Sequence, residues 1–337
     1  MNIENQYLNV LKNLVHKSQQ TEIRQDRTGT GTISTFGVQL RHDMSLGFPL
    51  LATKKVHFKS IVSELLWFMR GQTDLRNLLQ QKNTIWVGDA YKKYCTICKA
   101  NSNEFNEWLR DNGDGSLSMF TREQFIQQIL ENDRFSEKWG NLGPVYGKQW
   151  RNVESKTGSI DQLQDLVASL RETPYNRRQL VDAWNVSEIQ DMTLPPCHLL
   201  YQVYVEDMSK QEMKRNPGFS KKISLQYYIR SWDVFLGGPF NIASYALLLE
   251  FLGKMTGYKP AELISVSGDT HIYSNHIEAA KLQLSREPFY LPKLQLSSDI
   301  KFGGTVDEML SSITEPDVQI QLDGYFSHSK IQAELSN

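Results

Sequence analysis

Cys197 is the residue of this sequence whose setting most suggests chemistry. It follows two prolines in Leu194-Pro195-Pro196-Cys197-His198 and precedes an apolar run that predicts a strand over residues 199–205. Because proline fixes φ and biases the preceding residue toward extended geometry, we expect a rigidly held thiol. A second predicted strand, residues 223–229, ends in Arg230, and an arginine near a thiol lowers its pKa toward the nucleophilic thiolate. The alternative is that Cys197 fills the core, since free cysteine is often buried.

Two further residues are candidates for proton transfer. Glu64 lies in residues 58–69, where apolar side chains recur at helical spacing and Gly71 is placed to end the helix. A carboxylate there lies either at the exposed edge, the commoner situation, or is buried with a raised pKa that suits proton relay. Tyr146 is flanked by glycines in Leu142-Gly143-Pro144-Val145-Tyr146-Gly147, which predicts an accessible hydroxyl. It is either a proton-transfer group or an aromatic plug.

Arginines elsewhere in the chain are candidates for binding an anion. Arg27 lies in the Gly/Thr-rich turn of residues 26–32, whose backbone and hydroxyl donors can approach a phosphate, although such turns often merely connect a helix to a strand. Arg177 and Arg178 lead into a predicted strand, where adjacent side chains point to opposite faces. One is therefore expected to serve its own subunit and the other a neighbour, which hints at an oligomeric site.

Polar residues near the C-terminal half suggest recognition of a base or a sugar. Asn241 follows a glycine-rich turn and is predicted to be the N-cap of an apolar helix over residues 242–255, ended by Gly257. Its amide serves either as a cap or as a reader of a nucleobase edge, because it offers a donor and an acceptor side by side. His271 and His276 are five residues apart without a metalloprotease glutamate, so hydrogen bonding is expected and no metal.

The composition is that of an ordinary globular protein. The chain has 337 residues, 40% hydrophobic and 22% charged, and a formal net charge of -1, which gives no reason to expect nucleic acid as a partner. Cys95 and Cys98 have redox or zinc spacing, but no second ligand pair accompanies them, so we expect ordinary thiols in a reducing compartment. With no membrane-length apolar run and no signal-peptide pattern at the N-terminus, a cytoplasmic protein is expected.

The elements that must position these residues follow from periodicity. We predict helices over residues 4–18, 58–69 and 160–170, and a strand over residues 33–40. Residues 87–140 are polar and are expected to be a surface insertion with a small helical piece, in which Thr121 and Gln124 have capping-box spacing. Residues 206–222 form a polar connection too long for a tight hairpin.

Taken together, seven stretches resemble the thymidylate synthase family, in that family's order, and the resemblance covers residues 7–331 apart from the insertion and the long connection. The stretches are Asp26-Arg27-Thr28-Gly29-Thr30-Gly31-Thr32, Ser63-Glu64-Leu65-Leu66-Trp67-Phe68, Leu142-Gly143-Pro144-Val145-Tyr146-Gly147, Leu194-Pro195-Pro196-Cys197-His198, Arg230-Ser231-Trp232-Asp233-Val234-Phe235-Leu236-Gly237, Pro239-Phe240-Asn241-Ile242-Ala243-Ser244-Tyr245-Ala246-Leu247-Leu248 and Gly268-Asp269-Thr270-His271-Ile272-Tyr273-Ser274-Asn275-His276.

The resemblance implies a fold and a reaction. The fold is α+β, a single domain over residues 1–337 on a mixed, twisted sheet with flanking helices, which forms a homodimer through the sheet face. The reaction is the reductive methylation of dUMP to dTMP by 5,10-methylenetetrahydrofolate, which becomes dihydrofolate. No metal is implied.

The resemblance also implies roles for individual residues. Cys197 would attack C6 of uracil, which makes C5 nucleophilic. The other implied catalytic residues are Glu64, Tyr146 and His198 for proton and water transfer, and Arg230 for thiol activation. The implied dUMP-binding residues are Arg27, Arg230 and Ser231 for the phosphate, Arg177 and Arg178 from the partner for the same phosphate, Asn241 for the uracil edge, His271 and Tyr273 for the deoxyribose hydroxyl, and Asp233. The implied folate-binding residues are Asp233, Trp86, Gly237 and Lys54, the last favouring the anionic tail.

Three departures from the family pattern leave a runner-up open beside the synthase. Trp86 is followed by Val87-Gly88-Asp89-Ala90-Tyr91, where the family often has an acidic pair and a second tryptophan. The turn reads Gly237-Gly238-Pro239, with glycine where a larger apolar residue is usual. The tail ends in polar residues, where the family ends in a small apolar residue. A wetter site would let water compete with hydride, so the runner-up is a dUMP 5-hydroxymethylase. A second alternative is a catalytically silent nucleotide-binding protein, against which the cysteine itself argues.

Overall fold

The computed structural model describes residues 2–26, 28–100 and 119–334. Arg27 and the Asn112-Gly113-Asp114-Gly115 turn lie outside these residues. The described helices are α1 (Ile3–Lys17), η1 (Met44–Leu46), α2 (Phe58–Met69), α3 (Leu75–Gln80), α4 (Val87–Ala100), α6 (Arg122–Glu131), α7 (Asp133–Trp139), α8 (Tyr146–Arg151), α9 (Gln162–Glu172), α10 (Lys210–Arg215), α11 (Gly237–Thr256), η2 (Ser274–His276), α12 (Ile277–Leu284), α13 (Val306–Ser312) and α14 (Pro316–Gln319). The strands are β1 (Thr32–Asp43), β2 (Val153–Ser155), β3 (Gly158–Ile160), β4 (Leu180–Asp182), β5 (His198–Asp207), β6 (Lys221–Asp233), β7 (Lys259–Tyr273), β8 (Lys293–Leu296) and β9 (Ile320–Asp323).

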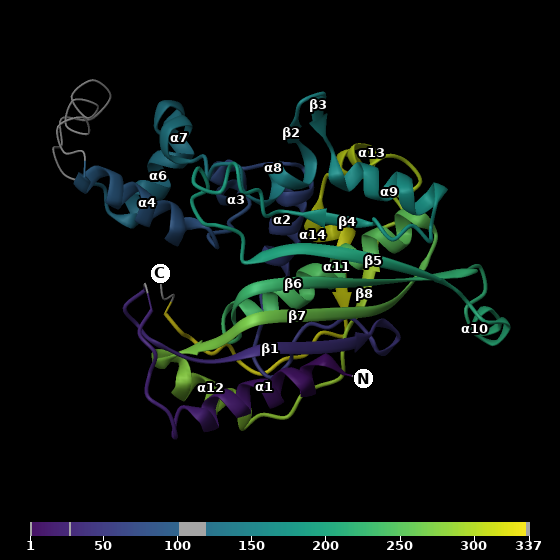
Figure 1. Cartoon of the computed structure of the whole chain (residues 1–337), viewed down its shortest axis with the longest axis horizontal. Helices are drawn as coiled ribbons and strands as arrows, with labels where there is room; N and C mark the ends of the chain where they lie inside the picture. Colours follow the sequence, from purple (N-terminus) through teal and green to yellow (C-terminus); the bar gives the residue numbers. More distant parts are fainter. Residues whose placement is uncertain (1, 27, 101–118, 335–337) are drawn as a thin grey trace.

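A mixed sheet lies at the centre of the molecule (Figure 1). Within the described residues its strand order is β1-β7-β6-β5-β4. The neighbours β6 and β7 run parallel, whereas the other neighbouring pairs run antiparallel. A mixed sheet with flanking helices confirms the α+β class that the sequence predicts.

Helix α11 connects the two parallel strands and packs in the hydrophobic core. Parallel strands need a crossover connection, and α11 provides it between β6 and β7. It is apolar around most of its circumference, packs on both strands and has α2 and α9 against it. Gly257 ends the helix in the left-handed conformation with φ 73°, as the sequence predicts. Because β6 and β7 end at the same edge, their last residues lie side by side there.

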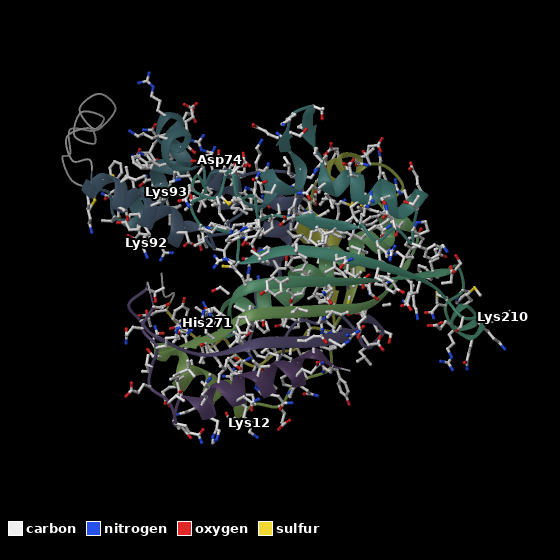
Figure 2. All side chains as sticks on the ribbon, in the orientation of Figure 1. Lys12, Asp74, Lys92, Lys93, Lys210 and His271 are labelled. Carbon is white, nitrogen blue, oxygen red and sulfur yellow. The ribbon has the colours of Figure 1, made fainter. Side chains whose placement is uncertain are left out.

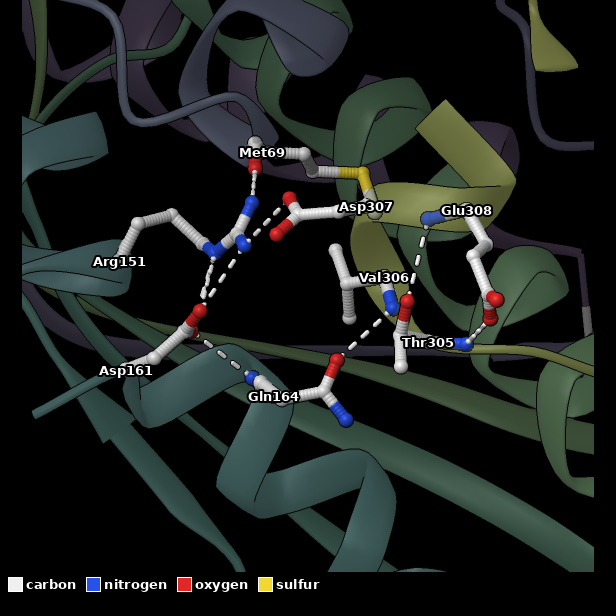
Figure 3. Close-up of polar contacts among 8 residues, drawn as sticks. All are labelled: Met69, Arg151, Asp161, Gln164, Thr305, Val306, Asp307 and Glu308. Carbon is white, nitrogen blue, oxygen red and sulfur yellow. Dashed lines mark hydrogen bonds and ion pairs between the residues drawn. The ribbon is translucent and has the colours of Figure 1, made fainter. Parts of the chain in front are cut away.

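Arg151 fixes α8, the short helix that begins with Tyr146. Its Nε donates to both carboxylate oxygens of Asp161 at 2.9 Å, and its Nη2 donates to Asp307 at 2.7 Å (Figure 3). A third bond runs from Nη1 to the carbonyl of Met69, the last residue of α2. One guanidinium thus ties the C-terminal end of α8 to α2, α9 and α13.

Two polar segments of the chain contain helices. The polar connection of residues 206–222 contains α10, begun by the capping box of Ser209 and Glu212, and joins the antiparallel pair β5 and β6. The described part of residues 87–140 holds α4, α6 and α7, with the predicted capping box of Thr121 and Gln124 at the start of α6. These helices share a buried aromatic cluster, so the segment is far more helical than predicted.

Candidate active site

The predicted pair Cys197 and Arg230 lies together at the head of β5. The backbone N–H of Arg230 donates to the carbonyl of Cys197 at 2.8 Å. The Arg230 side chain donates from Nε to the carbonyl of Pro196 at 2.8 Å and from Nη2 to that of Pro195 at 2.9 Å. The arginine therefore clamps the rigid dipeptide that precedes the thiol. Cys197 is half-buried.

Tyr146 contacts the backbone of Cys197. Its hydroxyl accepts the backbone N–H of Cys197 at 2.8 Å, and its ring stacks on His198 at 4.0 Å and 16°. The predicted accessible hydroxyl is wrong, because these long-range neighbours and Phe68, at 4.9 Å between ring centroids, bury the side chain. Burial, and then the nearby Cys197 charge, raise the pKa of Tyr146 well above its ordinary value, so the phenol is protonated at neutral pH.

His198 and Glu64 have strongly shifted pKa values. Burial lowers the pKa of His198 to about 3, and its Nδ1 bonds the hydroxyl of Tyr245 at 2.7 Å, so the imidazole is neutral. The commoner, exposed situation for Glu64 is not found: its Oε1 accepts the indole N–H of Trp86 at 2.8 Å. Desolvation outweighs this hydrogen bond and raises the pKa of Glu64 to about 7. A carboxyl group that titrates near neutrality can both take and give a proton.

The carboxyl ends of β6 and β7 bring expected phosphate- and sugar-binding residues together. In the parallel register Ser231 lies opposite Asp269, and Asp233 lies opposite His271. The Nδ1 of His271 bonds Asp269 Oδ1 at 3.0 Å, and the His271 ring contacts Tyr273 edge-on at 5.3 Å. Strand pairing therefore places these side chains at one edge of the sheet.

Asn241 lies inside α11 and is not its N-cap. The helix begins four residues earlier, at Gly237, because Asp233 Oδ1 accepts the N–H groups of Phe235 and Leu236 at 3.0 and 3.1 Å. This turn aims the first helical residues toward the end of β6. The capping interpretation of Asn241 is therefore wrong, and its amide is not used as a cap.

Lys54 contacts the turn that starts α11, whereas Trp86 is buried against Phe68 and Tyr146. Lys54 is buried, donates to the carbonyl of Phe235 and lies over the Phe235 ring at 3.8 Å. Burial lowers the pKa of Lys54 to about 8, although the negative charge of Asp233 opposes this. In this conformation the ammonium supports the turn before α11.

Arg177 and Arg178 are in a turn before β4, not on a strand. Asn176 Oδ1 accepts the backbone N–H of Arg178 at 3.0 Å, which is typical of an Asx turn. Both arginine side chains are exposed. The alternation argument for one arginine per subunit therefore does not apply.

Tyr245 is the residue that the sequence reasoning missed. It holds His198 and stacks on Tyr227 at 4.1 Å and 7°. The sequence signal for its place in the site is its position four residues after Asn241 in an apolar helix, since residues i and i+4 share a helix face.

Among residues 2–26, 28–100 and 119–334, no cluster of three or more histidine, cysteine or acidic side chains is arranged to hold a metal ion. In the same part of the chain, no helix combines the length and apolarity needed to cross a bilayer.

Fold and site together indicate an α+β enzyme with a reactive cysteine. This cysteine lies beside a neutral histidine, a protonated tyrosine and a carboxyl group with a pKa of about 7. The family model described as "Thymidylate synthase" matches residues 5–337. Relatives named "Thymidylate synthase" from Listeria monocytogenes serotype 4b (strain CLIP80459) and Listeria innocua serovar 6a (strain ATCC BAA-680 / CLIP 11262) are each 42% identical, over 98% of this chain and 99% of theirs. The chain belongs to the thymidylate synthase family, which confirms the resemblance.

Proposed function

We propose that this protein is a thymidylate synthase that converts dUMP to dTMP with methylenetetrahydrofolate. Family membership over residues 5–337 supports the activity. The observation that carries it in the structure is the position of Cys197, held by the Tyr146 hydroxyl and by the Arg230 clamp at the head of β5. Binding alone needs no thiol held in this way, so the silent-binder alternative is disfavoured.

Cys197 acts as the nucleophile in this proposal. Its sulfur bonds to C6 of the uracil, the electrons of the C5–C6 double bond move toward the C4 carbonyl, and C5 becomes nucleophilic. Glu64, with a pKa of about 7, donates and recovers the proton at the uracil carbonyl. Tyr146 stays protonated and orders the group that removes the C5 proton, and neutral His198 completes this network. C5 would bond to the one-carbon unit, and loss of the C5 proton would then release the folate. Addition of hydride to the transferred carbon would restore the C5–C6 double bond as the C6–S bond breaks and the Cys197 thiolate leaves.

The nucleotide is bound by residues at three places. Arg230 and Ser231 bind the phosphate together with Arg27, and Arg177 and Arg178 of the partner subunit complete this cluster, since guanidinium groups suit a phosphate dianion. Asn241 reads the uracil edge. His271 and Tyr273 bind the deoxyribose hydroxyl, which the pairing of His271 with Asp269 at 3.0 Å supports by fixing the imidazole.

The folate is bound beside the turn that starts α11. Methylenetetrahydrofolate supplies the one-carbon unit and the hydride. The turn suits such a group: Gly237 is partly exposed, and Asp233 makes both amide bonds through Oδ1, so Oδ2 retains acceptor capacity for a pterin N–H. Trp86, which the family resemblance implies on the folate side, is largely buried, with its indole N–H bonded to Glu64. Lys54 adds a positive charge close to the same turn.

We further propose that the uncovered sheet face forms a homodimer. It carries large exposed aromatic side chains, Phe36 at 82% and Tyr204 at 64% exposure. Apolar area of this kind on a sheet favours a protein partner, and a second copy would bring the exposed turn of Arg177 and Arg178 to the other site. Light scattering should give twice the chain mass for the wild type and a monomer for Tyr204→Asp.

One assay tests the activity. Purified enzyme is given dUMP and methylenetetrahydrofolate, and both the folate and the nucleotide products are identified. Dihydrofolate with dTMP supports the proposal. Tetrahydrofolate with 5-hydroxymethyl-dUMP would establish the hydroxymethylase instead, and an absence of turnover would leave only nucleotide binding.

A further inference from the structure

The segment that delivers Cys197 is held from more than one side. Thr193 donates its backbone N–H to the carbonyl of Leu142 at 2.8 Å. Next to it the segment packs directly on Gly143, where an added Cβ would lie 2.1 Å from the carbonyl oxygen of Asp191. The two prolines that follow are conformationally stiff, so a displacement at Thr193 is transmitted to the thiol.

Helix α4 supplies the contact on another side. Lys93 is half-buried, and its Nζ donates to the Thr193 hydroxyl at 3.3 Å. Burial lowers the pKa of Lys93, and the negative charge of Asp191 opposes this. Its neighbour Lys92 is exposed (Figure 2 labels both lysines on α4). The helix starts directly after Trp86, whose indole bonds Glu64 at 2.8 Å. One helix therefore links the carboxyl group of the site to the segment that carries the nucleophile.

We propose that Lys93 is a positioning residue: through Thr193 it fixes the lead-in to Cys197, and so makes α4 a working part of the active site. The proposal deepens the function above and rests on it. A hydrogen bond from an ammonium group is stronger than one between neutral groups, which suits a contact that must hold a backbone segment in place. The Thr193 side chain presents only its hydroxyl oxygen to this donor, so removal of either partner removes the contact.

Four variants of the full chain test the proposal. Lys93→Met and Thr193→Val each remove one partner, Lys93→Arg restores a cationic donor, and Lys92→Met is the matched control on the exposed neighbouring position. Two readouts are measured: the kinetic constants with dUMP, and the rate at which iodoacetamide alkylates Cys197, followed by mass spectrometry of the peptide that contains it. The second readout is specific to Cys197 and needs no substrate.

We expect Lys93→Met to lower kcat about tenfold while KM for dUMP changes by less than about twofold, because a transition-state geometry is lost and not a binding contact. Alkylation should slow by a similar factor. Thr193→Val should reproduce both effects, the double variant should be no worse than either single one, and Lys93→Arg should recover most of the rate. Lys92→Met should behave as wild type.

Equal losses in Lys92→Met and Lys93→Met, or additive losses in the double variant, would overturn the proposal. Wild-type kinetics in Thr193→Val would do the same, and this variant removes only a hydroxyl, so misfolding of Lys93→Met does not obscure the result. If the wild type fails to turn over dUMP, the proposed function fails, whereas the alkylation rates still decide whether Lys93 positions Cys197.

Discussion

The raised pKa of Glu64 leads to a quantitative prediction about stability. The folded carboxyl group titrates at about 7, against an ordinary value of 4.5, because desolvation disfavours its charged form. Between these two pH values the folded state binds a proton that the unfolded state has released, so stability falls as pH rises through this range. At about 1.4 kcal/mol per pH unit, the full penalty at pH 8 is ~3 kcal/mol, to be taken as an order of magnitude.

Glu64→Gln removes this ionisation and keeps an acceptor for the Trp86 indole. We therefore expect the unfolding free energies of wild type and variant to be similar near pH 5, and the variant to gain ~2–3 kcal/mol relative to wild type by pH 8. Urea unfolding of both proteins at pH 5, 6, 7 and 8 measures the difference, in which the other titrating groups cancel. A difference that does not change between pH 5 and pH 8 would refute the assigned environment of Glu64.

Three further substitutions probe the site and its support. Asn241→Asp should shift the ratio of kcat/KM values from dUMP toward dCMP, and an unchanged ratio would count against the base-reading role. Tyr146→Phe leaves the Cys197 N–H without its oxygen acceptor, so urea unfolding should show a loss of ~1–2 kcal/mol together with a lower kcat; full stability would argue that the bond is dispensable. Gly257→Ala places a side chain at φ 73° and should cost about 1 kcal/mol without affecting kinetics, as denaturation and steady-state assays will show.

Local patterns predicted several elements well because their signals are themselves local. Helix α2 was predicted with its bounds, Phe58 and Met69, from apolar spacing, and Gly71 ends it with φ 69°. The capping box at Thr121 is likewise a contact between residues three apart. The start of α11 was misplaced because the Asp233 side chain caps the turn before Gly237, which moves the helix start to a position without an obvious N-cap residue.

The site was predicted less well wherever burial depends on distant residues. Glu64 is enclosed through Trp86, which is 22 residues away, and the Tyr146 hydroxyl through Cys197, 51 residues away, so no local window indicates either pKa shift. The contact between Lys93 and Thr193 spans 100 residues and belongs to a segment that resembled a mere insertion. Family resemblance supplied the proposed roles of Glu64 and Tyr146, whereas the burial seen in the folded structure indicates their protonation states.

The most direct test of the central claim compares wild type with Cys197→Ser, which keeps the shape of the side chain but replaces the thiol by a far weaker nucleophile. Calorimetry measures dUMP affinity, and absorbance measures dihydrofolate formation from dUMP and methylenetetrahydrofolate. We predict that the variant binds dUMP as tightly as wild type and forms no dihydrofolate. Dihydrofolate formation by Cys197→Ser at the wild-type rate would contradict the account.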